Sequence, residues 1–97
     1  MHREMEQLLD IMRLLRDPQR GCPWDLEQNY QTIVPHTLEE AYEVADSIEK
    51  GDLDALQGEL GDLLFQVVFY AQLATEEGRF GFKEVVQSIN QRSEERR

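Results

Sequence analysis

Two short acidic motifs carry the side chains best suited to chemistry. They are Glu39-Glu40-x-x-Glu43 and Glu59-x-x-Asp62, about twenty residues apart. Each lies in a stretch that predicts a helix, and residues three apart share one face of a helix. Two such helices packed side by side would direct four carboxylates into one space, where the charges repel one another and lose solvation. A cation that prefers oxygen ligands relieves both effects, so the spacing predicts a hard-metal site, with Mg²⁺ as the first candidate.

The alternative interpretation is a solvent-exposed acidic face, which suits the first motif better than the second. Glu59 and Asp62 stand in Gly58-Glu59-Leu60-Gly61-Asp62-Leu63-Leu64-Phe65, where the helix becomes apolar. We therefore expect both acids to be buried, and buried acids need partners. The sequence has no lysine or arginine between Gly51 and Glu77 to serve as a local partner.

The ligand types narrow the choice of metal. Neither motif contains the histidine or cysteine that di-iron bundles and zinc sites use. A set made only of carboxylates suits Mg²⁺ or Mn²⁺. Because Mg²⁺ held by few protein ligands keeps water molecules and usually meets substrate phosphates, the motifs indicate phosphate chemistry.

A second feature is the loop Gly21-Cys22-Pro23-Trp24-Asp25. One interpretation is structural: a loop held by a buried Trp24 and capped by Asp25. The other is functional: a rigid loop whose Trp24 lines a nucleobase pocket. Cys22 has no positioned base and is not expected to be a nucleophile. We expect His36 to mark a helix start and not to act as a general base.

Basic residues near the end of the chain are candidates for binding the phosphates of a substrate. They are Lys83, Arg92 and Arg96, with Arg97 beside them. For Lys83 the alternative is an ordinary surface lysine. The arginines would also favour the negative end of a helix dipole.

Helices must position all of these residues. The apolar periodicity predicts four long helices: residues 5–15, from Pro35 or Thr37 to 50, 53–77, and from about 80 to 91. We also expect a short helix at 25–31 capped by Asp25, and a frayed tail from residue 92. Thr37 and Glu40 match a capping box, which would draw Glu40 away from a metal; a start at Pro35 removes that conflict. We see no strand signal, so the fold class is all-α.

The helix at 53–77 has apolar residues around its full circumference, which predicts burial on all sides. A chain of 97 residues has few helices with which to cover it. We therefore expect a homodimer, or a higher homo-oligomer, whose interface uses this helix and completes a helical bundle.

Composition excludes several functional classes. The net charge of −10 repels nucleic acids and anionic membranes, so we expect neither as a partner. An acidic protein that acts on phosphates must use divalent cations to bridge the two. No apolar run is long enough for a membrane span, the first residues lack a signal-peptide core, and the single Cys22 excludes an internal disulfide. These features predict a cytoplasmic protein.

With these motifs the chain resembles the MazG family of nucleoside triphosphate pyrophosphohydrolases. The resemblance runs over nearly the whole chain and rests on four segments in this order: Leu14-Leu15-Arg16-Asp17-Pro18, Gly21-Cys22-Pro23-Trp24-Asp25, Thr37-Leu38-Glu39-Glu40-Ala41-Tyr42-Glu43, and Gly58-Glu59-Leu60-Gly61-Asp62-Leu63-Leu64-Phe65-Gln66-Val67-Val68-Phe69. The bare acidic motifs alone would be a weak signal. Together with the loop they are a strong one.

The resemblance implies an all-α MazG-like helical bundle, with a four-helix core completed by dimerisation. It implies Mg²⁺-dependent cleavage of nucleoside triphosphates into a monophosphate and pyrophosphate, in a house-cleaning role that removes surplus nucleotides. It assigns Glu40, Glu43, Glu59 and Asp62 as metal ligands. Glu39 would lie outside the metal ligands or help to orient the attacking water, as a catalytic residue with Glu43.

The chain departs from the family pattern at its end. Similar proteins continue with a basic segment and a His-Pro-His-type sequence, whereas this chain ends in Arg92-Ser93-Glu94-Glu95-Arg96-Arg97. We therefore expect residues 1–97 to be a single MazG-like domain and a fragment, the first module of a longer two-module protein. The alternative function is a non-catalytic dimerisation or regulatory module that keeps the fold.

Overall fold

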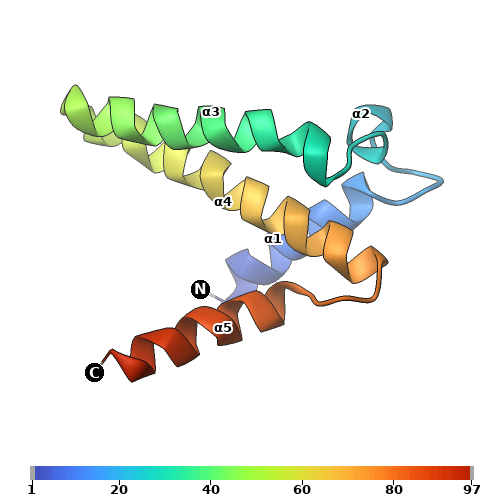
Figure 1. Cartoon of the computed structure of the whole chain (residues 1–97). Coiled ribbons are helices and arrows are strands. Elements are labelled where there is room, and N and C mark those ends of the chain that lie inside the picture. Colours follow the sequence, from blue (N-terminus) through green and yellow to red (C-terminus); the bar gives the residue numbers. More distant parts are fainter. Residues whose placement is uncertain (1, 97) are drawn as a thin grey trace.

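The computed structural model describes residues 2–96, which fold into helices joined by short connections. The helices are α1 (His2–Leu15), α2 (Pro23–Leu26), α3 (Tyr30–Glu49), α4 (Leu53–Glu76) and α5 (Phe82–Glu95). No strand occurs among these residues, which confirms the predicted all-α class. As Figure 1 shows, α3 and α4 lie side by side, joined by a tight turn, and α1 and α5 contact α4.

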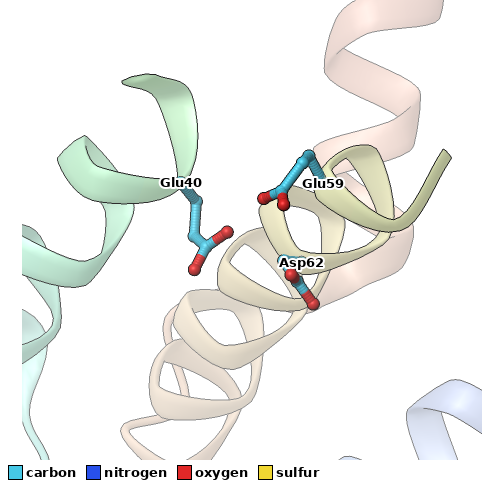
Figure 2. Close-up of side chains that lie close together, drawn as sticks. All are labelled: Glu40, Glu59 and Asp62. Atoms are coloured by element: carbon cyan, nitrogen blue, oxygen red, sulfur yellow. The ribbon is translucent and has the colours of Figure 1, made fainter. Parts of the chain in front are cut away.

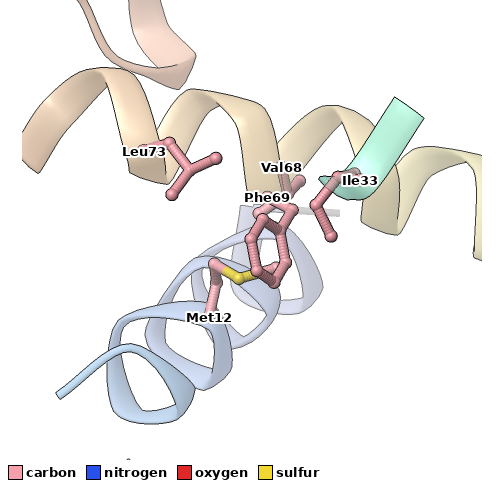
Figure 3. Close-up of a cluster of buried hydrophobic side chains, with 5 residues drawn as sticks. All are labelled: Met12, Ile33, Val68, Phe69 and Leu73. Carbon is pink, nitrogen blue, oxygen red and sulfur yellow. The ribbon is translucent and has the colours of Figure 1, made fainter. Parts of the chain in front are cut away.

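The hydrophobic core lies where α1, α3 and the C-terminal half of α4 meet. Its buried side chains are Met12, Ile33, Val68, Phe69 and Leu73. Met12 from α1 and Ile33 from α3 approach Phe69 of α4 (Figure 3). Phe82, at the start of α5, packs against the edge of this core. Four helices therefore pack together at the C-terminal end of α4, whereas its N-terminal end packs against α3 only, among the described residues.

The start of α3 differs from the prediction. Asn29 is the N-cap: its side chain accepts a hydrogen bond from the Thr32 N–H at 2.9 Å, and the Thr32 hydroxyl accepts one from the Asn29 N–H at 2.8 Å. This capping box satisfies the first backbone donors, so the helix begins five residues before Pro35 and runs through it. The predicted box of Thr37 and Glu40 is therefore wrong, and Glu40 is not engaged in capping.

The turn between α3 and α4 follows the prediction. Gly51 adopts a φ of 70°, the left-handed conformation that ends many helices. The Asp52 side chain then accepts a hydrogen bond from the Ala55 N–H at 3.0 Å and caps α4. This tight turn fixes α3 and α4 as an antiparallel pair.

The loop before α2 is tightly closed. At Gly21 a Cβ would lie 2.4 Å from the backbone oxygen of Leu15 and 2.5 Å from that of Asp17, so only glycine fits. Pro23 occupies the first turn of α2, where its missing N–H costs nothing. Asp25 is buried within α2 and does not cap a helix, so the predicted short helix at 25–31 is wrong.

Arg16 joins this loop to the far end of α4. Its guanidinium donates two hydrogen bonds to the Glu76 carboxylate, at 2.6 and 3.0 Å, and one each to the backbone oxygens of Asp25 (2.5 Å) and Gln28 (3.3 Å). It also lies 5.7 Å from the ring centroid of Phe69. The side chain is only 10% exposed, so these contacts are largely shielded from water.

Helix α5 is longer than predicted. It extends to Glu95, so residues 92–95 are helical and not frayed, and Arg97 lies outside the described residues. The Glu84 carboxylate accepts a hydrogen bond from the Gly81 N–H at 2.8 Å and caps the start of α5. No residue of α5 is fully buried, because only its first turn reaches the core.

The burial of α4 is one-sided in the single chain. Its C-terminal half contains the buried Val68, Phe69, Ala71, Leu73 and Ala74. Its N-terminal half instead exposes Leu60 and Leu64, and Val67 just beyond the midpoint is also exposed, so the prediction of burial on all sides fails for one chain alone. Within residues 2–96, no helix is both long and apolar enough to cross a bilayer.

Arg16→Lys should lower the free energy of unfolding by about 2 kcal/mol, because an ammonium cannot replace the forked contacts with one carboxylate and two carbonyls. Chemical denaturation would measure this. Arg13→Lys is the matched control: Arg13 pairs with Asp10 on the surface of α1 and is 61% exposed, so its replacement should change stability little. Equal losses in both variants would refute the structural role of Arg16.

Candidate metal centre

The packing of α3 on α4 brings three carboxylates together. Glu40 of α3 and Glu59 and Asp62 of α4 each offer one oxygen, and these oxygens all lie within 4.8 Å of one another. Figure 2 shows Glu40 reaching across from α3 toward the two acids on α4. Glu59 and Asp62 are three residues apart and so share one helix face. The structure thus assembles three of the four residues that the sequence predicts as metal ligands.

The burial of these acids differs from the prediction. Glu40 and Glu59 are partly buried, whereas Asp62 is exposed in the single chain. One oxygen of Glu40, Oε2, is inaccessible to water and has no hydrogen-bond partner among residues 2–96. A buried carboxylate oxygen without a partner costs free energy, and a cation in contact with it would remove that cost. The donor set therefore fits a hard cation such as Mg²⁺ or Mn²⁺.

The surroundings raise the pKa of two of these carboxyl groups. Burial raises the pKa of Glu40, and the charges of Asp62 and Glu59 raise it further. Burial also raises the pKa of Glu59, followed by the charges of Glu43, Asp62 and Asp46. In the described part of the chain, no lysine or arginine forms an ion pair with Glu40, Glu59 or Asp62. The cluster is therefore an uncompensated concentration of negative charge.

The remaining acids of the first motif lie around this cluster. Glu43 and Glu39 are exposed and are not members of the three-carboxylate group. Glu43 nevertheless lies close enough for its charge to raise the pKa of Glu59, and Glu39 acts likewise on Glu40. Asp46, which pairs with Lys50 at 2.9 Å, adds a further negative charge beyond them.

A polar network beside the cluster escaped the sequence analysis. The Thr37 hydroxyl lies 2.6 Å from the hydroxyl of Tyr70 and donates a longer hydrogen bond, 3.4 Å, to Gln66 Oε1. Thr37 precedes Glu40 by three residues and Gln66 follows Asp62 by four, so both lie one turn from a carboxylate of the cluster. The sequence contained that spacing, but it indicates a polar network only once the pairing of α3 with α4 is known.

Trp24, on the short helix α2, lies beside α3. Its side chain is 50% exposed, so the interpretation as a buried, purely structural tryptophan is wrong. Its ring packs nearly perpendicular to that of His36, with centroids 5.5 Å apart and an interplanar angle of 76°. His36 is an exposed residue inside α3, so the prediction that it marks the start of the helix is wrong.

The predicted phosphate-binding residues are not brought to the acidic cluster in the single chain. Lys83 and Arg92 both lie on α5, and Arg96 follows that helix directly. This helix starts at the core against the C-terminal half of α4, whereas Glu59 and Asp62 lie in its N-terminal half. None of the three contributes to the pKa of Glu40 or Glu59.

The sequence model of the MazG nucleotide pyrophosphohydrolase domain matches residues 28–97, a span that includes both acidic motifs. The chain belongs to the MazG family. Membership confirms the MazG-like, all-α fold class.

Several curated proteins are similar to this MazG chain. The nucleoside triphosphate pyrophosphohydrolase of Escherichia coli K12 is 59% identical over 93 residues, which cover 96% of this chain and 35% of that protein. The nucleoside triphosphate pyrophosphohydrolase/pyrophosphatase MazG of Thermotoga maritima is 41% identical over 87 residues, which cover 90% of this chain and 34% of that protein. The chain therefore spans about a third of the length of these relatives.

Glu40→Gln should raise the melting temperature of this MazG domain by several degrees at neutral pH in the presence of a chelator. The variant removes one of the crowded charges and keeps a polar side chain of similar size. Because the pKa of Glu40 is raised in the folded chain, the folded state binds this proton more tightly than the unfolded state. The advantage of the variant should thus shrink as the pH falls toward 4.5, the ordinary value, and disappear below it.

Differential scanning calorimetry of both proteins across this pH range would measure the gap. Glu6→Gln, at an exposed position of α1, is the matched control for the change in net charge. A gap that is the same for both variants at every pH would show that Glu40 is not in a crowded site.

Proposed function

We propose that this MazG domain hydrolyses nucleoside triphosphates to a monophosphate and pyrophosphate, with Mg²⁺ as its cofactor and Mn²⁺ as a substitute. The observation that carries the proposal is the cluster of Glu40, Glu59 and Asp62, in which Glu40 Oε2 is buried and has no hydrogen-bond partner in the described part of the chain. The names of the relatives support the reaction class, and the acidic surface makes direct binding of a free triphosphate unfavourable without cations.

Glu40, Glu59 and Asp62 would hold the metal. Mg²⁺ bound there supplies positive charge that polarises the phosphoryl oxygens and offsets their repulsion from the acids. Glu43, exposed beside Glu59, is the fourth carboxylate that we propose for this site, as a ligand or as the group that accepts a proton from the attacking water. Glu39 would orient that water. No covalent intermediate on a side chain is required.

The binding of the nucleoside falls to other residues. Trp24 exposes half of its side chain beside α3 and is suited to stack on a base. Lys83, Arg92 and Arg96 are the candidates for contacting the triphosphate. Because they lie on or directly after α5, away from the cluster of the same chain, such contacts would involve a second chain or a movement of α5.

We further propose that the domain acts as a homodimer. Two exposed apolar stripes run along the paired helices: Val34, Leu38 and Ile48 on α3, and Leu53, Leu60, Leu64 and Val67 on α4. Their spacing places each set on one helix face. Burial of both stripes against a second copy would complete a four-helix core, as the apolar character of α4 predicts. A higher homo-oligomer would extend the same contacts.

The biological role that follows is nucleotide-pool house-cleaning in the cytoplasm. This role rests on the proposed reaction, which converts a triphosphate that polymerases use into a monophosphate that they do not use. The chain would then be one module of a longer protein, in keeping with the length of its relatives.

Product analysis would test the reaction. With Mg²⁺, the chain should release pyrophosphate and a nucleoside monophosphate, and Glu43→Gln and Asp62→Asn should each lower turnover by about 100-fold or more without loss of the fold. Glu6→Gln should retain the activity. Release of orthophosphate would place the cleavage elsewhere, and a folded dimer that binds Mg²⁺ without turnover would favour a non-catalytic MazG module.

Light scattering after size exclusion, at several protein concentrations, would test the dimer. Replacing both Leu38 and Leu64 with glutamine should raise the dimer dissociation constant by about tenfold or more, because it removes apolar area from both stripes. Leu14→Gln on α1, where Leu14 is 62% exposed outside the stripes, should leave the constant nearly unchanged. A wild-type chain that is monomeric throughout would contradict the proposal.

A further inference from the structure

The contact between Trp24 and His36 has no role in the core. Neither residue belongs to the buried cluster at α1, α3 and α4, and both are exposed. Trp24 is 50% exposed, so little packing free energy holds its side chain in one position. The indole nevertheless makes a defined edge-to-face contact with His36. A perpendicular pair engages at most one face of the indole, and half of Trp24 remains exposed, which leaves surface for a second aromatic group.

The chain holds Trp24 through its backbone. The Gln28 side chain donates a hydrogen bond to the Trp24 backbone oxygen at 2.9 Å, and Arg16 binds the next carbonyl, that of Asp25, at 2.5 Å. The loop before it closes so tightly that only glycine fits at position 21. The loop and α2 thus form a rigid support whose exposed aromatic side chain is aimed at α3. Such preorganisation lowers the entropy cost of binding a flat ligand.

His36 links this aromatic pair to the carboxylate cluster. It precedes Glu40 by four residues in the same uninterrupted helix, so the two side chains project from the same side of α3, about 6 Å apart along the axis. One side of α3 therefore presents an aromatic surface next to a site suited to a cation. A nucleoside triphosphate has the same order of parts: a flat base, a sugar, and an anionic chain that binds metal.

We propose that His36 is a specificity-determining residue of this site, where it contacts the base of the nucleotide together with Trp24. The proposal rests on the function proposed above and names the residue that recognises the base. The neutral imidazole carries one donor and one acceptor on its edge, so it can pair with polar groups of a base that the indole cannot distinguish. Trp24 supplies stacking, which tolerates every base, and His36 supplies the selection among them.

Binding can be measured without turnover, by calorimetry with Mg²⁺ and α,β-methylene analogues of the nucleoside triphosphates. Inorganic tripolyphosphate is the probe that lacks a base. His36→Ala should weaken binding of the best nucleotide analogue by about tenfold, as expected for loss of one base contact, and change binding of tripolyphosphate less than twofold. His36→Phe should keep the edge contact with Trp24 and restore only part of the affinity, and it should reduce the differences among bases because phenylalanine has no donor or acceptor. His2→Ala, at the other histidine of the chain, is the control.

Trp24 is the only tryptophan, so its fluorescence reports directly on this surface. The nucleotide analogue should change the emission and tripolyphosphate should not. Equal fluorescence changes with both probes, or equal loss of both affinities in His36→Ala, would overturn the role of His36 while leaving the metal site intact. Failure of both probes to bind with Mg²⁺ would overturn the proposed function itself, and with it this inference.

Discussion

The packing of α3 along α4 is the constraint on which the rest of the structure depends. Apolar contacts hold the two helices together, and the tight turn at Gly51 and Asp52 fixes how they are aligned. That alignment places Glu40 against Glu59 and Asp62, although like charges repel and one oxygen of Glu40 is buried without a hydrogen-bond partner among residues 2–96. The buried hydrophobic core at the other end of α4 offsets the free-energy cost of this repulsion and burial. A cation in the cluster would turn this cost into binding free energy, because the ligands are already assembled before it arrives.

A second set of contacts fixes what lies beside the cluster. Arg16 joins α2 to the end of α4, because it binds both the backbone oxygen of Asp25 and the carboxylate of Glu76. The position of Trp24 on α2 therefore depends on Glu76, which lies outside the acidic cluster. The capping box at Asn29 starts α3 four residues after the end of α2, and His36 in the second turn of α3 contacts the indole. His36 of the aromatic pair and Glu40 of the acidic cluster thus lie on one helix, α3, whose rise sets their separation along its axis.

The single chain leaves much apolar surface uncovered for its size. A 97-residue chain buries a modest share of its surface, and here the fully buried side chains gather at one end of α4. The exposed apolar stripes lie on α3 and α4, the two helices that also carry the acids. Assembly and catalysis would therefore depend on the same pair of helices, and a change that loosens their packing would affect both.

The sequence by itself determined the features that depend on neighbouring residues along one helix. Helical periodicity is local, so it correctly indicated the all-α class, the caps at Gly51 and Asp52, and the shared face of Glu59 and Asp62. It failed at the start of α3, where we predicted Pro35 as the first residue and missed the capping box at Asn29. Pro35 lies in the second turn, where its missing N–H removes one backbone hydrogen bond without ending the helix. Only the tertiary structure decided which acids meet, that Trp24 is exposed, and that it touches His36. These depend on the alignment of two helices and the path of a loop, which arise from contacts between residues far apart in the chain.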